Sequence, residues 1–260
     1  MKFLSIALVT IASLYFLIGA GLYLFQRHLL YYPTKEVSVA NAEILYLNQD
    51  STRLKVWKID NEAESAIIYF GGNAEPVSYN IDNLRAVVPG RDIYLLNYRG
   101  YGGSDGSPSE AALYADALAL YDLIKDDYSD IAVIGRSLGS GVATHLGANR
   151  PVDKLALITP YDSITNVIQA KFPIYPVRVL LHDKYNSAAN AARIEAPVLI
   201  LLAEGDGVIP RPHSDALAAQ FPSPPQIVVI PATDHLSVSQ PSAFWVTLSE
   251  FFSAREDVNS

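Results

Sequence analysis

One serine of the sequence lies in a glycine-rich stretch typical of a bend between a strand and a helix. Residues 134–141 read IGRSLGSG, so Ser137 has a glycine two positions before it and another two positions after it. A short apolar run precedes the stretch and a helix-like run, residues 141–149, follows it. A strained bend in this setting exposes a serine hydroxyl near the positive end of a helix. The pattern predicts that Ser137 is a nucleophile.

The same glycines could instead cradle a phosphate group. A dinucleotide-binding fingerprint that begins at Gly139 finds Gly141 but then meets Thr144, where a small residue is required. A fingerprint that begins at Gly135 has Ser137 at the position of its second glycine. The Walker pattern of nucleotide-binding loops is also incomplete, because its Gly-Lys-Ser/Thr end is missing. The spacing therefore disfavours phosphate binding.

A nucleophilic serine needs a base, and one of the five histidines is well placed to supply it. His235 follows the predicted strand 226–230 in the short loop PATDH. This position lies at the carboxyl edge of a parallel sheet, where open α/β folds bind their ligands. We interpret the other four as surface or structural residues: His28, His145, His182 and His213.

Two aspartates are candidates for the acid that orients this base. Asp206 lies between two glycines after the predicted strand 198–203, in a turn that can aim its carboxylate. Asp162 follows the strand before it and is the alternative acid. We favour Asp206, and we interpret Glu204 and Asp234 as solvated turn residues.

An acyl-transfer site also needs N–H donors for the negative oxygen that develops on the substrate. The backbone N–H of Leu138, directly after the nucleophile, is one predicted donor. The loop after the third predicted strand reads GGNAE, and its paired glycines allow a close approach of backbone to substrate. We expect the Asn73 N–H to be the second donor, with Ala74 as a possible substitute and a plain glycine turn as the alternative.

Alternating strand-length and helix-length apolar runs must position these residues. The best helix pattern covers residues 107–125, with Ser107 as the predicted cap, Pro108 at the first helical position and Glu110 at the third. Such alternation implies an α/β fold with a mostly parallel sheet and helices on both faces. The predicted strands are residues 43–47, 53–59, 66–70, 93–98, 131–134, 154–158, 198–203 and 226–230.

Two segments do not fit this alternation. Residues 160–196 are rich in aromatics and prolines without a clean strand, and an insertion of this size is usually a lid. Residues 3–25 carry no charge, and about 23 helical residues at about 1.5 Å each can span a bilayer. We expect a membrane anchor over residues 1–26 and a catalytic domain over residues 27–260. A cleaved signal peptide and a buried core helix are the alternatives, and the cations on both sides of the apolar run predict no orientation.

Composition narrows the class of protein further. The 260 residues are 50% hydrophobic and 18% charged, which is enough for a sizeable core in one domain plus an appendage. The net charge of −8 argues against nucleic-acid binding, and the lack of cysteine excludes disulfides and thiolate chemistry. No metal or cofactor is expected.

Several stretches together resemble the α/β-hydrolase superfamily, and within it the membrane-anchored α/β-hydrolase-domain proteins. These stretches read LLYYP, FGGNAEPV, NYRGYGGSDGSPSE and GRSLGSG, joined by the turns at Asp206 and His235. The resemblance implies an α/β-hydrolase fold with an eight-stranded sheet. It also implies serine hydrolysis of esters or thioesters, with Ser137 as nucleophile, His235 as base and Asp206 as acid, in the chain order typical of this fold.

The expected function is that of a membrane-tethered serine hydrolase that works through an acyl-enzyme. Its expected substrate is a small-molecule or lipid-like acyl compound, or an acylated protein, and its expected location is the membrane. The alternatives are a serine peptidase of the prolyl-oligopeptidase type and a catalytically idle adaptor with the same fold.

Overall fold

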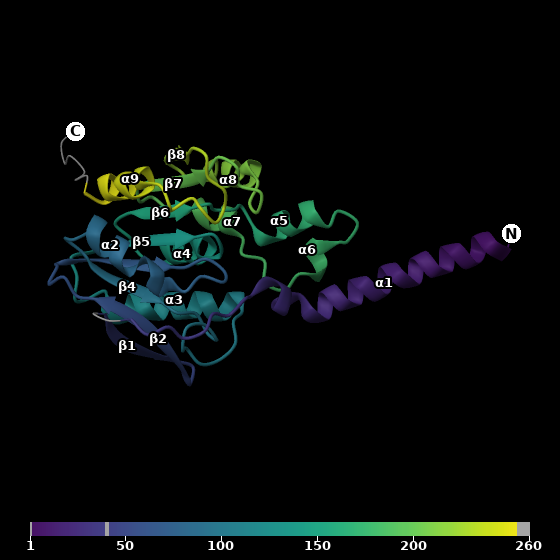
Figure 1. Cartoon of the computed structure of the whole chain (residues 1–260), viewed down its shortest axis with the longest axis horizontal. Coiled ribbons are helices and arrows are strands. Elements are labelled where there is room, and N and C mark those ends of the chain that lie inside the picture. The colour runs from purple at the N-terminus through teal and green to yellow at the C-terminus, as the bar shows by residue number, and fades with distance from the viewer. Residues whose placement is uncertain (1, 40–41, 254–260) are drawn as a thin grey trace.

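The computed structural model describes residues 2–39 and 42–253, and it shows an α/β body from which one long N-terminal helix projects (Figure 1). The strand order is β1-β2-β4-β3-β5-β6-β7-β8. The pairs β1·β2 and β2·β4 are antiparallel, and the other pairs are parallel, which confirms the predicted eight-stranded, mostly parallel sheet. The strands are β1 (Glu43–Gln49), β2 (Thr52–Ile59), β3 (Ser65–Phe70), β4 (Asp92–Leu96), β5 (Asp130–Arg136), β6 (Leu155–Ile158), β7 (Val198–Ala203) and β8 (Gln226–Ile230).

Helices cover both faces of this sheet. Successive strand residues point to opposite faces, and in the central strands both sets of side chains are apolar and packed in a core. Ile68 belongs to a core shared with α3 (Glu110–Ile124), α4 (Leu138–Asn149) and α8 (Arg211–Ala218). Its neighbour Ile67 belongs to the opposite core, shared with a 3₁₀ turn (Val77–Asn80), α2 (Ile81–Val87) and α9 (Ser242–Ser253). Both faces of the central strands are therefore buried, as near-continuous apolar runs predict.

The start of α3 differs from the predicted capping box. Ser109, and not Ser107, is the cap, and its hydroxyl accepts a hydrogen bond from the N–H of Ala112 at 3.3 Å. Glu110 is the first residue of the helix. Its carboxylate does not reach back to the cap, because it accepts hydrogen bonds from the N–H groups of Lys184 and Tyr185 instead.

The predicted lid, residues 160–196, contains three short helices. They are α5 (Ile164–Lys171), α6 (Val177–Leu180) and α7 (Ser187–Ala191). In Figure 1, α5, α6 and their connection extend from the sheet edge to the side of the N-terminal helix. The lid is thus a small helical layer and not an irregular loop.

The N-terminal helix α1 (Lys2–Leu30) is the one described helix long and apolar enough to cross a membrane. It continues four residues past the predicted anchor end at residue 26. It stops after Leu30 because the N–H of Tyr32 donates to the Asn73 side chain at 2.9 Å, and Pro33, which has no N–H, follows. Most of α1 is exposed.

Candidate active site

Ser137 occupies a strained bend between β5 and α4. Its φ of 47° is unusual for a residue other than glycine, and α4 begins at the next residue. A Cβ added to Gly135 would lie 2.5 Å from the Ala143 Cβ, and one added to Gly139 would lie 2.1 Å from the Phe70 carbonyl oxygen. The two glycines are therefore needed because α4 packs directly on the ends of β5 and β3.

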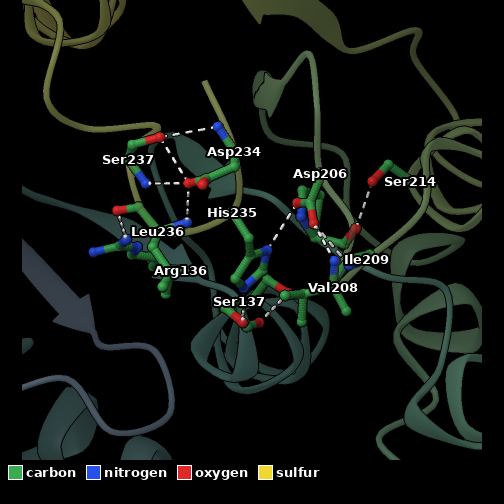
Figure 2. Close-up of polar contacts among 12 residues, drawn as sticks. Arg136, Ser137, Asp206, Val208, Ile209, Ser214, Asp234, His235, Leu236 and Ser237 are labelled. Atoms are coloured by element: carbon green, nitrogen blue, oxygen red, sulfur yellow. Dashed lines mark hydrogen bonds and ion pairs between the residues drawn. The ribbon is translucent and has the colours of Figure 1, made fainter. Parts of the chain in front are cut away.

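The structure brings the serine, the histidine and the favoured acid together (Figure 2). His235 Nε2 lies 2.8 Å from Ser137 Oγ, and His235 Nδ1 lies 2.7 Å from Asp206 Oδ2. The other oxygen, Asp206 Oδ1, accepts hydrogen bonds from the N–H groups of Val208 and Ile209 at 2.9 and 2.8 Å. A carboxylate only accepts, so Nδ1 carries the proton and Nε2 is free to accept one from the serine.

The alternative acid, Asp162, lies in a different pair. Its Oδ1 lies 2.8 Å from Nδ1 of His213, and its Oδ2 accepts a hydrogen bond from the amide of Asn166. Asp162 therefore pairs with His213, whereas Asp206 pairs with His235.

The turn that carries His235 is held from two sides. Asp234 Oδ1 accepts hydrogen bonds from the N–H groups of Leu236 and Ser237 at 3.0 and 2.9 Å (Figure 2). The Ser237 hydroxyl also donates to this carboxylate, and these bonds lower the pKa of Asp234. Arg136 donates to the Leu236 carbonyl oxygen at 3.1 Å. Asp234, expected to be a solvated turn residue, is exposed and stabilises the turn.

The residues that carry the predicted oxyanion donors line the same cavity as the serine. These residues are Asn73 and Leu138, and among the residues that the structure describes neither predicted N–H donor has a hydrogen-bond partner. The Asn73 side chain donates to the Leu30 carbonyl oxygen at 2.6 Å and accepts from the Tyr101 hydroxyl at 2.8 Å. It thereby fixes the loop against the end of α1.

Glu75 is a positioning residue that the sequence analysis missed. Its carboxylate accepts hydrogen bonds from the Gly72 N–H, the Tyr69 hydroxyl and the Asn80 amide at 2.5, 2.7 and 2.5 Å. Arg136 lies 3.5 Å away as an ion pair. Burial, together with the charge of Glu75, raises the pKa of Tyr69, so the phenol stays a donor. The sequence feature that could have identified Glu75 is its position three residues after Gly72, the second of the paired glycines. From there its carboxylate can accept a hydrogen bond from the Gly72 N–H.

An apolar cavity of about 640 Å³ opens at Ser137. Its walls come from α1, from the lid and from the loops around the serine. Within the described residues, no group of three or more His, Asp or Glu side chains is arranged to hold a metal ion. The lining residues are Gly19, Leu22, Tyr23, Gln26, Leu29, Leu30, Tyr32, Asn73, Ser137, Leu138, Tyr161, Ile164, Val167, Ile168, Lys171, Phe172, Tyr175, Val177, Leu180, Leu181, Val208 and Ile209.

Comparisons with known proteins agree with this architecture. No protein-family model matches the chain. An uncharacterised protein of Mycobacterium tuberculosis is 33% identical over 238 residues, which cover 84% of this chain and 85% of that protein. The α/β-hydrolase domain-containing protein WAV2 of Arabidopsis thaliana is 26% identical over 87% of each chain. The lysophosphatidylserine lipase ABHD12 of Macaca fascicularis is 32% identical over 60% of this chain and 46% of that protein.

Solved structures show the same fold. An esterase of Pyrococcus furiosus superposes with a TM-score of 0.69 at 16% identity, over 85% of this chain and 98% of the esterase. At this identity the likeness concerns the fold alone. The bend at Ser137, the eight-stranded sheet and the near-full-length relatives lead to one conclusion: the chain belongs to the α/β-hydrolase superfamily.

Proposed function

We propose that the chain is a membrane-anchored serine hydrolase that cleaves carboxylic esters or thioesters. One observation carries this proposal: Ser137, His235 and Asp206 form a continuous hydrogen-bonded chain that ends at the apolar cavity. A serine hydroxyl that donates to a neutral, oriented imidazole is an activated nucleophile.

The reaction would follow two steps. Ser137 Oγ attacks the substrate carbonyl carbon as His235 Nε2 takes the hydroxyl proton, and Asp206 stabilises the resulting imidazolium. The N–H groups of Leu138 and Asn73 would hold the oxyanion of the tetrahedral intermediate. The intermediate collapses to an acyl-enzyme, and the leaving alcohol or thiol takes the proton from His235. Water, deprotonated by the same nitrogen, then attacks the acyl-enzyme and releases the acid and the free serine.

The cavity favours a lipophilic acyl group. Most of its lining side chains are aliphatic or aromatic, and each methylene buried there contributes about 0.8 kcal/mol, or about fourfold in binding. The relative named as a lysophosphatidylserine lipase supports a lipid-like substrate. An acylated protein is the second substrate class that such a cavity would fit.

The membrane anchor is α1. Its length and the uncharged run of residues 3–25 support a single crossing of the bilayer, and a yeast relative is called a membrane protein. An anchor beside the cavity would keep the serine close to lipids.

Labelling with a fluorophosphonate probe tests the proposal. The folded protein should form one adduct at Ser137 and hydrolyse p-nitrophenyl esters, and Ser137→Ala should abolish both. Ser140→Ala, three residues further in the same motif, is the matched control and should keep the adduct. A folded protein without an adduct would instead be an idle adaptor, and an adduct with cleavage of peptides but not esters would indicate the peptidase.

A further inference from the structure

The lid packs against the middle of α1 and not only against its end. The Tyr15 hydroxyl donates to the Ile174 carbonyl oxygen at 3.0 Å, and the Tyr175 hydroxyl donates to the Tyr15 carbonyl oxygen at 3.2 Å. The rings of Tyr15 and Tyr175 stack with centroids 4.7 Å apart. Figure 1 shows the connection between α5 and α6 alongside α1. We call residues 172–176, which form this connection, the lid tip.

These contacts place the lid tip beside the middle of the apolar run of α1. Tyr15 precedes Phe25, the last residue of the apolar run, by ten positions, which is about 15 Å along a helix axis. The hydrocarbon layer of a bilayer is about 30 Å thick. If α1 crosses the membrane, Ile174 lies beside it at the depth of lipid tails.

The exposed surface of this part of the lid suits such a depth. Ile174 is 69% exposed, and the neighbouring Phe172 and Val179 are also exposed. The sequence between Asp162 and Asp183 contains no acidic residue. Together with the neighbouring apolar helix α1, these side chains form an apolar patch whose exposure to water would be unfavourable.

The two cations near the lid tip turn back toward the catalytic domain. Lys171 Nζ donates to the Val208 carbonyl oxygen at 3.1 Å. Arg178 donates to Asn166 Oδ1 at 3.5 Å. Both charges thus point away from the tip, as long cationic side chains do when their stems lie in lipid.

Several backbone groups of the lid tip have hydrogen-bond partners within the protein, which lowers the cost of placing a non-helical segment at membrane depth. Residues 172–176 contain two prolines, which have no N–H. The Gln169 amide donates to the carbonyl oxygens of Phe172 and Tyr175 at 3.3 and 3.0 Å. Its oxygen accepts a hydrogen bond from the Val177 N–H at 3.2 Å. One polar side chain therefore replaces water for three backbone groups.

The same side of α1 is a wall of the cavity. Gly19, Leu22, Gln26 and Leu30 are half-buried and repeat every three or four residues, so they form one stripe along the helix. All four line the cavity, and Ile168 of α5 lies in its lining as well. A helix that served as a tether alone would need no such stripe.

We propose that the lid tip is embedded in the hydrocarbon layer beside α1, and that a lipid acyl chain moves sideways from the bilayer into the cavity between α1 and α5. The proposal rests on the membrane crossing of α1 given under the proposed function. It assigns the lid to contact with lipid tails and makes α1 part of the acyl-binding site.

A single cysteine can report the depth directly, because the chain has none of its own. Ile174→Cys carries a nitroxide label in protein reconstituted into phosphatidylcholine nanodiscs, and Leu123→Cys on α3, where the side chain is 50% exposed, is the control. The label at 174 should be relaxed by oxygen and protected from a water-soluble nickel chelate, with the reverse at 123. Equal access of the nickel chelate to both labels would overturn the proposal.

Activity tests the sideways entry. We expect Ile174→Asp to lower the rate on a long-chain ester embedded in the nanodisc about tenfold or more relative to the rate on soluble p-nitrophenyl butyrate, because a carboxylate opposes insertion. Leu123→Asp should leave this ratio unchanged. An unchanged ratio in Ile174→Asp would refute entry from the bilayer. A parent protein that hydrolyses neither ester would refute the hydrolase proposal, and the nitroxide depth would still decide where the lid tip lies.

Discussion

Replacing Asp206 with asparagine should prevent His235 from acting as the base without changing the shape of the site. Asp206 Oδ1 accepts two backbone N–H groups, at Val208 and Ile209, and an amide NH₂ cannot accept them. The asparagine oxygen must therefore stay there, and its NH₂ must face His235 Nδ1. The imidazole then holds its proton on Nε2, which donates to Ser137 and can no longer take the hydroxyl proton.

The expected loss follows from this change of tautomer. A triad with its base in the wrong tautomer loses about 10⁴ in kcat, which corresponds to about 5.4 kcal/mol of transition-state stabilisation. The oxyanion donors are untouched, so a residual rate above that of water should remain. The KM for a short ester should change little because the cavity is unaltered.

Hydrolysis of p-nitrophenyl butyrate by Asp206→Asn and Asp162→Asn measures the effect. The control is closely matched, since both aspartates are largely buried and each pairs with a histidine Nδ1. Asp162→Asn should stay within about threefold of the parent kcat, because it leaves the base in its active tautomer. The reasoning is refuted if folded Asp206→Asn keeps a tenth or more of the parent kcat. It is also refuted if Asp162→Asn loses this activity and Asp206→Asn does not.

Three further changes test the surroundings of the site. Gly139→Ala would place a Cβ 2.1 Å from the Phe70 carbonyl oxygen, so the bend at Ser137 must shift. We expect kcat to fall about a hundredfold, and an unchanged kcat would contradict the packing. Glu75→Gln weakens the support of the Gly72 N–H and should lower kcat about tenfold with KM unchanged, whereas a change in KM alone would argue against a positioning role. Burial and two nearby arginines lower the pKa of His145 to about 4. In the unfolded chain His145 binds its proton near pH 6.5, so the free energy of unfolding should decrease as the pH falls from about 6.5 to about 4. The decrease should be smaller in His145→Phe. Urea unfolding of both proteins at the two pH values measures the difference.

Under the proposed function, the α1 helix serves two purposes. Its apolar run predicts a membrane helix whatever the rest of the chain does. Its half-buried stripe, from Tyr15 to Leu30, packs on the lid and lines the cavity. A truncated, soluble form of the chain would therefore lack part of the cavity wall, and the full chain is the form to assay.

The sequence by itself determined the features that depend on local chemistry. Glycine spacing placed Ser137 in a strand-to-helix bend, since only residues without side chains fit where α4 meets β5 and β3. Apolar periodicity gave the strands and the mostly parallel sheet, because burial on both faces demands continuous apolar runs. The uncharged run of α1 was equally plain.

Only the tertiary structure decided which distant groups meet. Asp206 and Asp162 each follow a strand, and the sequence cannot show that one carboxylate reaches His235 and the other His213. Glu75 acts on backbone and side chains that come together only after folding. The lid contact with Tyr15 joins residues about 160 positions apart. Such pairings depend on loop paths and side-chain packing across the whole domain, for which local propensity carries no signal.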